Sequence, residues 1–176
     1  MILRIDASRR RRLAFEVGDL QGTVTGQANM TVENRQRVLD LLAAITRSDL
    51  DAALSHCTDE VDFLTHAPID VLPHMGPRRG KAELRRLWET VDARYSEIRY
   101  QLPQVLAEGD SVAIYLRAFF RKRSNGRVVQ FDMAVFYHFH DGLISQIREI
   151  IDSYDLVQQV LEREIGPLIT GGQDGG

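Results

Sequence analysis

Arg148 is the side chain whose type and position most suggest chemistry. Apolar residues alternate along the segment Val128–Ile151, which predicts a strand with one dry face. Asp141-Gly142 interrupts the segment and predicts a tight hairpin turn, because both turn residues need positive φ. A two-residue turn pairs Arg148 with Val135 on the dry face. An unpaired guanidinium is costly there. We therefore expect Arg148 to bind either a ligand anion or an acid of the protein, Asp152 or one from a loop.

Three further side chains are predicted to line a pocket beside this arginine. The same register pairs Tyr137 with Gln146, which supply a phenol and an amide. Trp88 lies on the apolar stripe of an expected helix and is assigned as an aromatic wall. A tryptophan on such a stripe more often packs in a plain core.

His66 is the expected proton-transfer group. It follows a short expected strand, residues 61–65, and begins a loop, residues 66–80, that is rich in proline and glycine. An imidazole can move protons near neutral pH. The alternative is a loop histidine that is bonded to the backbone. No spacing suggests a metal site, and we expect no metal and no cofactor.

The elements that must position these residues follow from the same patterns. Apolar periodicity predicts helices near residues 31–47, 49–57 and 81–95 and a last helix over residues 155–164. Pro103 interrupts an expected strand at residues 98–106, which belongs at a sheet edge or a bulge. Asn125-Gly126 predicts a second tight turn. The fold class is α+β: a cone-shaped curved antiparallel sheet packed on three N-terminal helices, with a short C-terminal helix.

The outer face of this sheet is predicted to be mixed in character. Arg117, Asp132 and Glu149 come close together there, and we interpret them as an ionic cluster within a dimer contact. Apolar residues share the face, and water disfavours such a patch. We expect a homodimer through this outer sheet face, with the apolar contacts made by Phe119, Phe136, Ile147 and Ile151.

Composition bounds the class of protein. The chain has 176 residues, with 44% hydrophobic and 27% charged content, which is ordinary for a globular domain with a real core. No apolar run approaches the roughly 20 residues of a membrane span. The single cysteine, Cys57, is predicted to be a buried structural thiol and fits a reducing compartment, so we expect a cytoplasmic protein.

The two ends differ from the body of the chain. Residues 1–29 contain five arginines and three acids, which leaves a net charge of −5 on the remainder and argues against nucleic-acid binding. We interpret residues 1–29 as a disordered or mis-started extension, with a basic arm as the alternative. Residues 30–166 form the domain, and residues 167–176 form a flexible tail.

This order of elements resembles the nuclear transport factor 2-like superfamily, which includes ketosteroid isomerases, SnoaL-like polyketide cyclases and limonene epoxide hydrolase. The resemblance covers Thr31 to about Glu164. It rests on the segments LAAITRSDLDAALSHCTDEVDFL, MGPRRGKAELRRLW and FYHFHDGLISQIREIIDSYD. It implies a cone with a pocket, a small apolar ligand and usually a dimer.

The resemblance does not carry over a reaction. In the ketosteroid isomerases a tyrosine and an aspartic acid hold the oxyanion and an aspartate moves the proton; the matching positions here are Leu41, Val135 and Thr65. The epoxide hydrolase uses an Arg-x-Asp pair, and the matching positions are Ala118 and Phe120. All these roles are empty in this chain.

Two functions remain open. The first is a SnoaL-like pocket enzyme, an isomerase, cyclase or hydrolase that acts on a small apolar substrate with an acidic or carbonyl oxygen. In it His66 moves a proton and Arg148 stabilises the anion, with Tyr137 or Gln146 assisting. The second is a non-catalytic ligand-binding or dimeric interaction module of the same fold.

Overall fold

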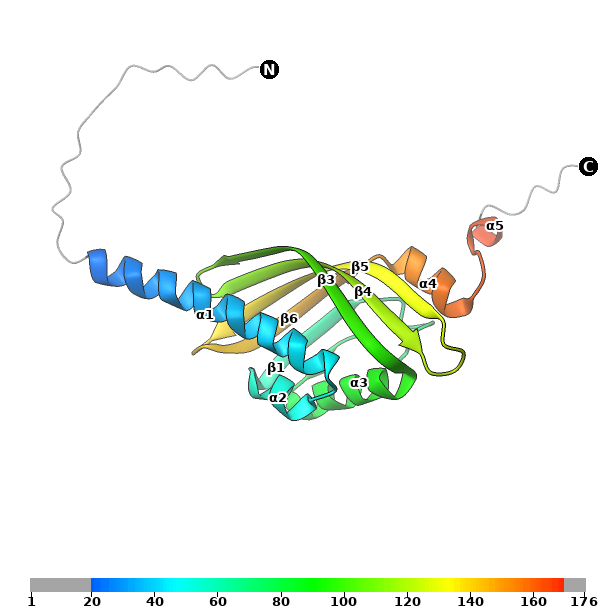
Figure 1. Cartoon of the computed structure of the whole chain (residues 1–176), viewed down its shortest axis with the longest axis horizontal. Coiled ribbons are helices and arrows are strands. Elements are labelled where there is room, and N and C mark those ends of the chain that lie inside the picture. The colour runs from blue at the N-terminus through cyan, green and yellow to red at the C-terminus, as the bar shows by residue number, and fades with distance from the viewer. Residues whose placement is uncertain (1–19, 170–176) are drawn as a thin grey trace, which may run out of the picture.

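The computed structural model describes residues 20–169, and Figure 1 shows a curved sheet that arches over the N-terminal helices. Residues 1–19 and 170–176 lie outside the described range, and the domain boundaries remain predictions. The helix that was expected from Thr31 begins at Leu20. The elements are α1 (Leu20–Thr46), α2 (Leu50–Ser55), β1 (Cys57–His66), β2 (Arg78–Arg79), α3 (Lys81–Arg94), β3 (Tyr95–Glu108), β4 (Ser111–Lys122), β5 (Val128–His140), β6 (Leu143–Ile151), α4 (Ser153–Leu161) and α5 (Gly166–Ile169).

The α+β cone predicted from the sequence is confirmed, with one change in the sheet. The strand order is β2-β1-β6-β5-β4-β3, and the sheet curves without closing. All pairs are antiparallel except β1 and β6, which run parallel, so the sheet is mixed where an antiparallel one was predicted. In Figure 1 helices α1 and α3 lie under the concave face, and α4 follows β6 at the far end.

Helix α1 is tied to the sheet by polar contacts at the β3–β4 turn. The side chain of Asn34 is buried and donates to the carbonyl of Gly109 at 3.1 Å. The Thr31 hydroxyl accepts from the Gly109 amide at 3.2 Å, so this residue lies within the helix and does not cap it. Two apolar residues, Val38 and Leu41, then bury their side chains in the core and fix the helix against the concave face.

Local signals in the sequence correctly place several element ends. Asp49 caps α2, because its carboxylate accepts from the Ala52 amide at 3.1 Å. Strand β3 is an edge strand, and its register shifts between Gln101 and Gln104, so Pro103 lies in a bulge as predicted.

The loop between β4 and β5 is longer than predicted, but each side chain of these two strands still lies on its predicted face of the sheet. The loop has four residues, 123–126, and is closed by a hydrogen bond from the Lys122 amide to the Arg127 carbonyl at 2.8 Å. A two-residue turn at Asn125-Gly126 would pair Ala118 with Met133, whereas Ala118 pairs with Phe131. A shift of two residues keeps every side chain on its predicted face, because the strand period is two.

The hairpin between β5 and β6 starts as predicted and then slips by one residue. Asp141 and Gly142 form the turn with positive φ, and His140 pairs with Leu143. A bulge follows, after which Val135 pairs with Glu149 and not with Arg148.

This single extra residue exchanges the two faces of the rest of β6. Ile147 is only 2% exposed, and Ile151 is also buried, so both belong to the core and not to the outer face. Gln146 and Arg148 lie on the outer face, and the predicted pairing of Tyr137 with Gln146 is wrong. A one-residue slip sends every later side chain to the opposite side of a sheet.

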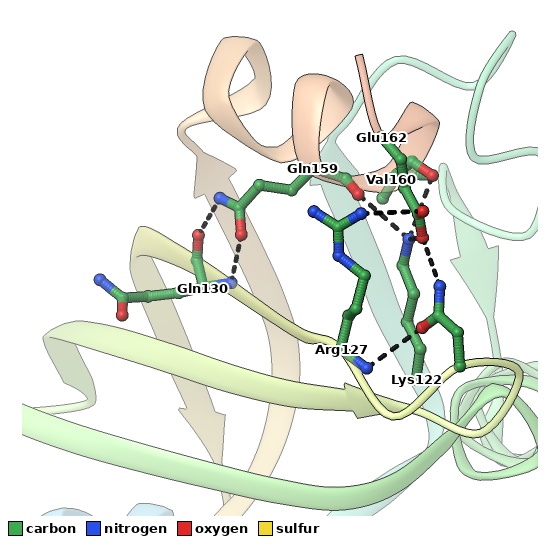
Figure 2. Close-up of polar contacts among 7 residues, drawn as sticks. Lys122, Arg127, Gln130, Gln159, Val160 and Glu162 are labelled. Carbon is green, nitrogen blue, oxygen red and sulfur yellow. Dashed lines mark hydrogen bonds and ion pairs between the residues drawn. The ribbon is translucent and has the colours of Figure 1, made fainter. Parts of the chain in front are cut away.

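The C-terminal helix is held by a set of polar contacts that we call the C-terminal anchor: Lys122, Asn125, Arg127, Gln159 and Glu162. The Lys122 ammonium donates to the carbonyls of Gln159 and Val160 at 3.0 and 3.2 Å and to the Glu162 carboxylate at 2.9 Å (Figure 2). The Gln159 side chain also bonds the backbone of Gln130, which fixes α4 to β5. A cation at a helix C-terminus is favourable because it neutralises the exposed carbonyls.

Two further properties concern the whole described range. No helix within residues 20–169 is long and apolar enough to span a membrane. Cys57 is fully buried at the start of β1, and burial raises the pKa of its thiol to about 12, which fits a structural residue.

Candidate active site

The interior of the cone contains a pocket between the concave sheet face and helices α1 and α3. Its atom-free space is about 700 Å³ including the open mouth, of which about 80 Å³ is free to the centres of water molecules. Its walls are almost entirely apolar and aromatic, and they include Trp88, Tyr100, Phe120, Phe131, Tyr137 and Glu149.

Glu149 is the only acid among the described residues that line this pocket. It lies on β6 between Thr65 of β1 and Val135 of β5. No lysine, arginine or histidine of the described chain forms an ion pair with it. Glu149 as a whole residue is half-buried, but its carboxyl lies among the apolar walls, and the loss of water there raises its pKa to about 7. This carboxyl can therefore exist in both protonation states near neutral pH.

The Thr65 hydroxyl is the polar group nearest to this acid in the ladder. Thr65 is 2% exposed, and its oxygen meets the geometry of a hydrogen bond with no group in residues 20–169. It still lies close enough to lower the pKa of Glu149, against the larger effect of burial. Burial thus destabilises the carboxylate anion of Glu149, and the Thr65 hydroxyl offsets only a small part of this effect.

Two tyrosines complete the polar content of the pocket. Burial, reinforced by the nearby negative charge of Glu149, raises the pKa values of the Tyr100 and Tyr137 phenols. Both therefore remain neutral hydrogen-bond donors at physiological pH. In the described structure neither hydroxyl has a hydrogen-bond partner, so both are available to a ligand oxygen.

Edge-to-face aromatic contacts fix the walls around these hydroxyls. The ring of Phe120 lies 6.2 Å from that of Tyr100 and 5.3 Å from that of Phe131, with interplanar angles of 64° and 75°. Such contacts are favourable because the positive ring edge meets the negative face. The tyrosine on β3 is therefore held by rigid neighbours on β4 and β5.

The structure brings together only some of the residues that the sequence singled out. Trp88 and Tyr137 line the pocket, and their binding roles remain predictions. His66 is exposed at the end of β1 and does not line the pocket. Gln146 pairs with His138 on the outer side of β6 and is also absent from the lining.

The predicted place of Arg148 on the dry face is wrong. Its guanidinium forms an ion pair with the Asp62 carboxylate, and Nη1 donates to the carbonyls of Asp62 and Ile147 at 2.9 Å each. The pair is partly solvated, with 27% of the Arg148 side chain and 49% of the Asp62 side chain exposed. Of the two alternatives, an acid of the protein is the observed partner. Asp152 is not that acid, because it caps α4 by accepting from the Asp155 amide.

The outer sheet face retains part of its predicted character. Arg117 and Asp132 form a bidentate ion pair, with Nε–Oδ1 2.6 Å and Nη2–Oδ2 2.9 Å. Glu149 is not part of this cluster, since it faces the pocket. The exposed large apolar side chains of this face include Leu106, Tyr115, Val128, Phe136 and Ile150, and the homodimer remains a prediction.

The spacing of apolar residues in β6 could have revealed Glu149. Strict alternation from Ile144 places Gln146 and Arg148 on the dry face, whereas Ile144, Ile147 and Ile151 are the buried residues. The odd gap between Ile144 and Ile147 is what a bulge produces, because one extra residue restarts the alternation. With that bulge the inward-facing residues of β6 include one acid, Glu149.

The sequence and the fold are similar to those of known proteins. The SnoaL-like domain family matches residues 38–147. A solved structure of a proposed isomerase from Rhodopseudomonas palustris is 28% identical, with a TM-score of 0.66 over 72% of this chain and 93% of that one. A nuclear transport factor 2-like protein from Burkholderia xenovorans is 25% identical, with a TM-score of 0.61 over 73% and 95% of the two chains.

A more distant structure shares the fold alone. An epoxide hydrolase of the limonene type from Mycobacterium tuberculosis is 19% identical, with a TM-score of 0.63 over 80% of this chain and 98% of that one. Among curated protein sequences no significant match is found.

Proposed function

Because the chain belongs to the SnoaL-like domain family, we propose that it is a small-molecule enzyme that moves a proton on a neutral, carbonyl-bearing substrate. The observation that carries this proposal is Glu149, an unpaired carboxyl with a pKa of about 7 among apolar walls. A general base works best when its pKa lies near the operating pH. The likeness to a proposed isomerase at 28% identity supports the same class of chemistry.

The proposed reaction is a proton transfer at a carbon next to a carbonyl group. The Glu149 carboxylate takes the proton, and the electrons of the broken C–H bond move to the carbonyl oxygen. Tyr137 and Tyr100 donate hydrogen bonds to that oxygen as its negative charge develops. The carboxylic acid then gives its proton to a conjugated carbon, or first exchanges that proton with solvent water and then protonates the same carbon. The outcome is exchange or isomerisation, and the step balances without a cofactor.

The pocket also restricts the substrate. About 80 Å³ of its space is free to the centres of water molecules, which suits a small molecule. No lysine or arginine is among the described lining residues, so a substrate anion would have no partner and would face the Glu149 charge. We therefore propose a carbonyl oxygen on a neutral substrate, in preference to the acidic oxygen that Arg148 would have served.

Hydrogen exchange of a simple ketone tests the proposal. Cyclohexanone in D₂O loses its α-hydrogen signals slowly, and ¹H NMR measures the rate. We expect the wild-type protein to accelerate this exchange and Glu149→Gln to reduce the acceleration by about 10²–10⁴-fold. Glu162→Gln is the matched control, because Glu162 belongs to the C-terminal anchor and not to the pocket. Equal exchange in the wild type and Glu149→Gln contradicts the proposal.

A non-catalytic binding module is the second candidate. It is favoured by the apolar residues Leu41 and Val135, which stand where related isomerases carry catalytic side chains. On this alternative cyclohexanone would bind, as shift changes of the Trp88 indole would report, with no acceleration of exchange. The two candidate functions therefore predict different exchange rates in the same cyclohexanone experiment.

A further inference from the structure

The concave face of β1 carries one polar residue that packing alone does not explain. Val61 and Phe63 precede Thr65 on this face, and both are apolar and buried. In the described chain the buried polar residues are Asn34 and Thr65. Asn34 donates to the Gly109 carbonyl, whereas the Thr65 hydroxyl has no partner in residues 20–169. A buried hydroxyl without a partner is unfavourable, and valine would fill the same volume without that cost.

The neighbour of this hydroxyl is the acid of the proposed active site. Thr65 and Glu149 are direct partners in the parallel ladder of β1 and β6, so their side chains leave the sheet on the same side. Glu149 forms no ion pair within the described residues, and the Thr65 hydroxyl meets strict hydrogen-bond geometry with no group there, although it lies near enough to the Glu149 carboxyl to lower its pKa. Two polar side chains thus lie next to each other on the concave face, Glu149 in the pocket lining and Thr65 beside it in the ladder.

We propose that Thr65 is a positioning residue for Glu149, whose carboxylate accepts a hydrogen bond from the Thr65 hydroxyl when it ionises. This inference rests on the proposed function, since it concerns the same carboxyl. A hydroxyl rotates about its C–O bond and can donate or accept. It donates to the carboxylate before the proton transfer and can accept from the carboxylic acid after it. The tyrosine hydroxyls stay free for the substrate oxygen.

Such a contact sets the fraction of active base. Hydrogen bonding to the charged form favours that form, and thus lowers the pKa of an acid. The nearby Thr65 hydroxyl already acts on Glu149 in this direction. Without it burial alone would hold the carboxyl protonated further above neutrality. Thr65 would therefore keep a usable share of carboxylate at neutral pH.

The test is a titration of Glu149 in Thr65 variants, followed by ¹³C NMR of its side-chain carboxyl and assigned with Glu149→Gln. We expect Thr65→Val to raise the midpoint by about one pH unit, roughly a tenfold change in the equilibrium, since hydrogen bonds to charged groups are the stronger ones. Thr65→Ser keeps the hydroxyl and should titrate close to the wild type. Cyclohexanone exchange in Thr65→Val should show the same shift of its pH profile and recover at higher pH.

The outcomes separate this inference from the proposed function. A midpoint that Thr65→Val leaves unchanged overturns the role of Thr65, whatever value the wild type shows. A wild-type midpoint near 4.5 that rises in Thr65→Val supports Thr65 and overturns the proposed function. Urea unfolding at pH 4, where the carboxyl is protonated, should show Thr65→Val to be at least as stable as the wild type. A loss there with no shift of the titration would identify Thr65 as structural and overturn the inference.

Discussion

Glu149 in the pocket and Glu162 in the C-terminal anchor are the same side chain in opposite surroundings. Glu162 accepts from Lys122, Asn125 and Arg127 at 2.6–2.9 Å, and these bonds hold its pKa at about 2 (Figure 2). Glu149 has no cation partner in the described chain, and burial raises its pKa to about 7. The anchor therefore favours the charged carboxylate, whereas the pocket opposes it.

The ionised Glu162 stabilises the folded state, whereas the ionised Glu149 destabilises it. A paired surface acid lowers the free energy of the folded state at neutral pH. An unpaired acid among apolar walls raises it, and such strain is typical of functional sites. The following four changes test whether the two acids really act in opposite directions.

Glu149→Gln should have the largest effect on stability. The folded-state pKa of Glu149 is raised from 4.5 to about 7, so the unfolded chain ionises first. The wild type therefore loses stability as pH rises from 4.5 to 7, and the loss stays constant above 7. The neutral glutamine avoids it. We expect the variant to be more stable than the wild type at pH 8, by at most about 3 kcal/mol, and equal to it at pH 4. Urea unfolding at both values measures this.

The difference between variant and wild type is the quantity to compare, because His74 titrates in the same range. Burial, with Arg94 and Arg78 nearby, lowers the pKa of His74 to about 4, so its contribution to stability is lost as pH falls from 6.5 to 4. This opposes the Glu149 trend in the wild-type profile and cancels in the difference. Equal stability of the two proteins at pH 8 would contradict the strained carboxyl.

Arg148→Met should have the next largest effect. The Asp62 ion pair is partly solvated, so we expect a loss of about 1–2 kcal/mol in urea unfolding. Asp62→Asn is the matched variant, and the double variant should lose little more than either single one. The Glu149 titration should not move, because Arg148 does not line the pocket. A loss of cyclohexanone binding in Arg148→Met would show that Arg148 contributes to the binding site after all.

Tyr137→Phe should weaken ligand binding more than it weakens the fold. The Tyr137 hydroxyl has no partner within the described protein, so its removal should leave the free energy of unfolding nearly unchanged. A carbonyl ligand loses one hydrogen bond, about 1 kcal/mol or roughly a fivefold rise in Kd. Titration of the Trp88 indole signals with cyclohexanone measures it, with Tyr115→Phe as the control on the outer face. An unchanged Kd would remove Tyr137 from the proposed oxyanion contact.

Glu162→Gln should have the smallest effect, with the sign opposite to that of Glu149→Gln. The folded-state pKa of Glu162 lies below its unfolded value of 4.5, so its contribution is present above pH 4.5 and is lost as pH falls through about 2. The variant should be slightly less stable than the wild type at pH 7, and the gap should close on acidification. Thermal unfolding across pH 3–7 measures it. If Glu162→Gln were more stable than the wild type at pH 7, the two acids would not act in opposite directions on stability.

The fold was predictable because its signals are local. Asp49 caps α2, Pro103 marks the bulge in an edge strand, and Asp141-Gly142 turns between β5 and β6. Each signal acts through its own backbone and needs no knowledge of distant contacts.

The pocket was harder to predict because it depends on the register of β6. One extra residue after Ile144 decides whether Arg148 or Glu149 faces the interior. A charge on the dry face is costly, and the bulge avoids this cost because it places Arg148 on the outer face, where it pairs with Asp62. Thr65 and Tyr100 come near Glu149 because β1 pairs with β6 and β3 pairs with β4. No local sequence pattern shows these pairings.

A ¹³C NMR titration of the side-chain carboxyls tests the central claim most directly. One series of spectra of the wild-type protein contains both acids, assigned with Glu149→Gln and Glu162→Gln. The structure predicts a Glu149 midpoint near pH 7 and a Glu162 carboxyl that stays ionised at the lowest pH at which the protein remains folded. A Glu149 midpoint at or below 4.5 would show that its carboxylate is solvated or paired, and would contradict the proposed acid–base pocket.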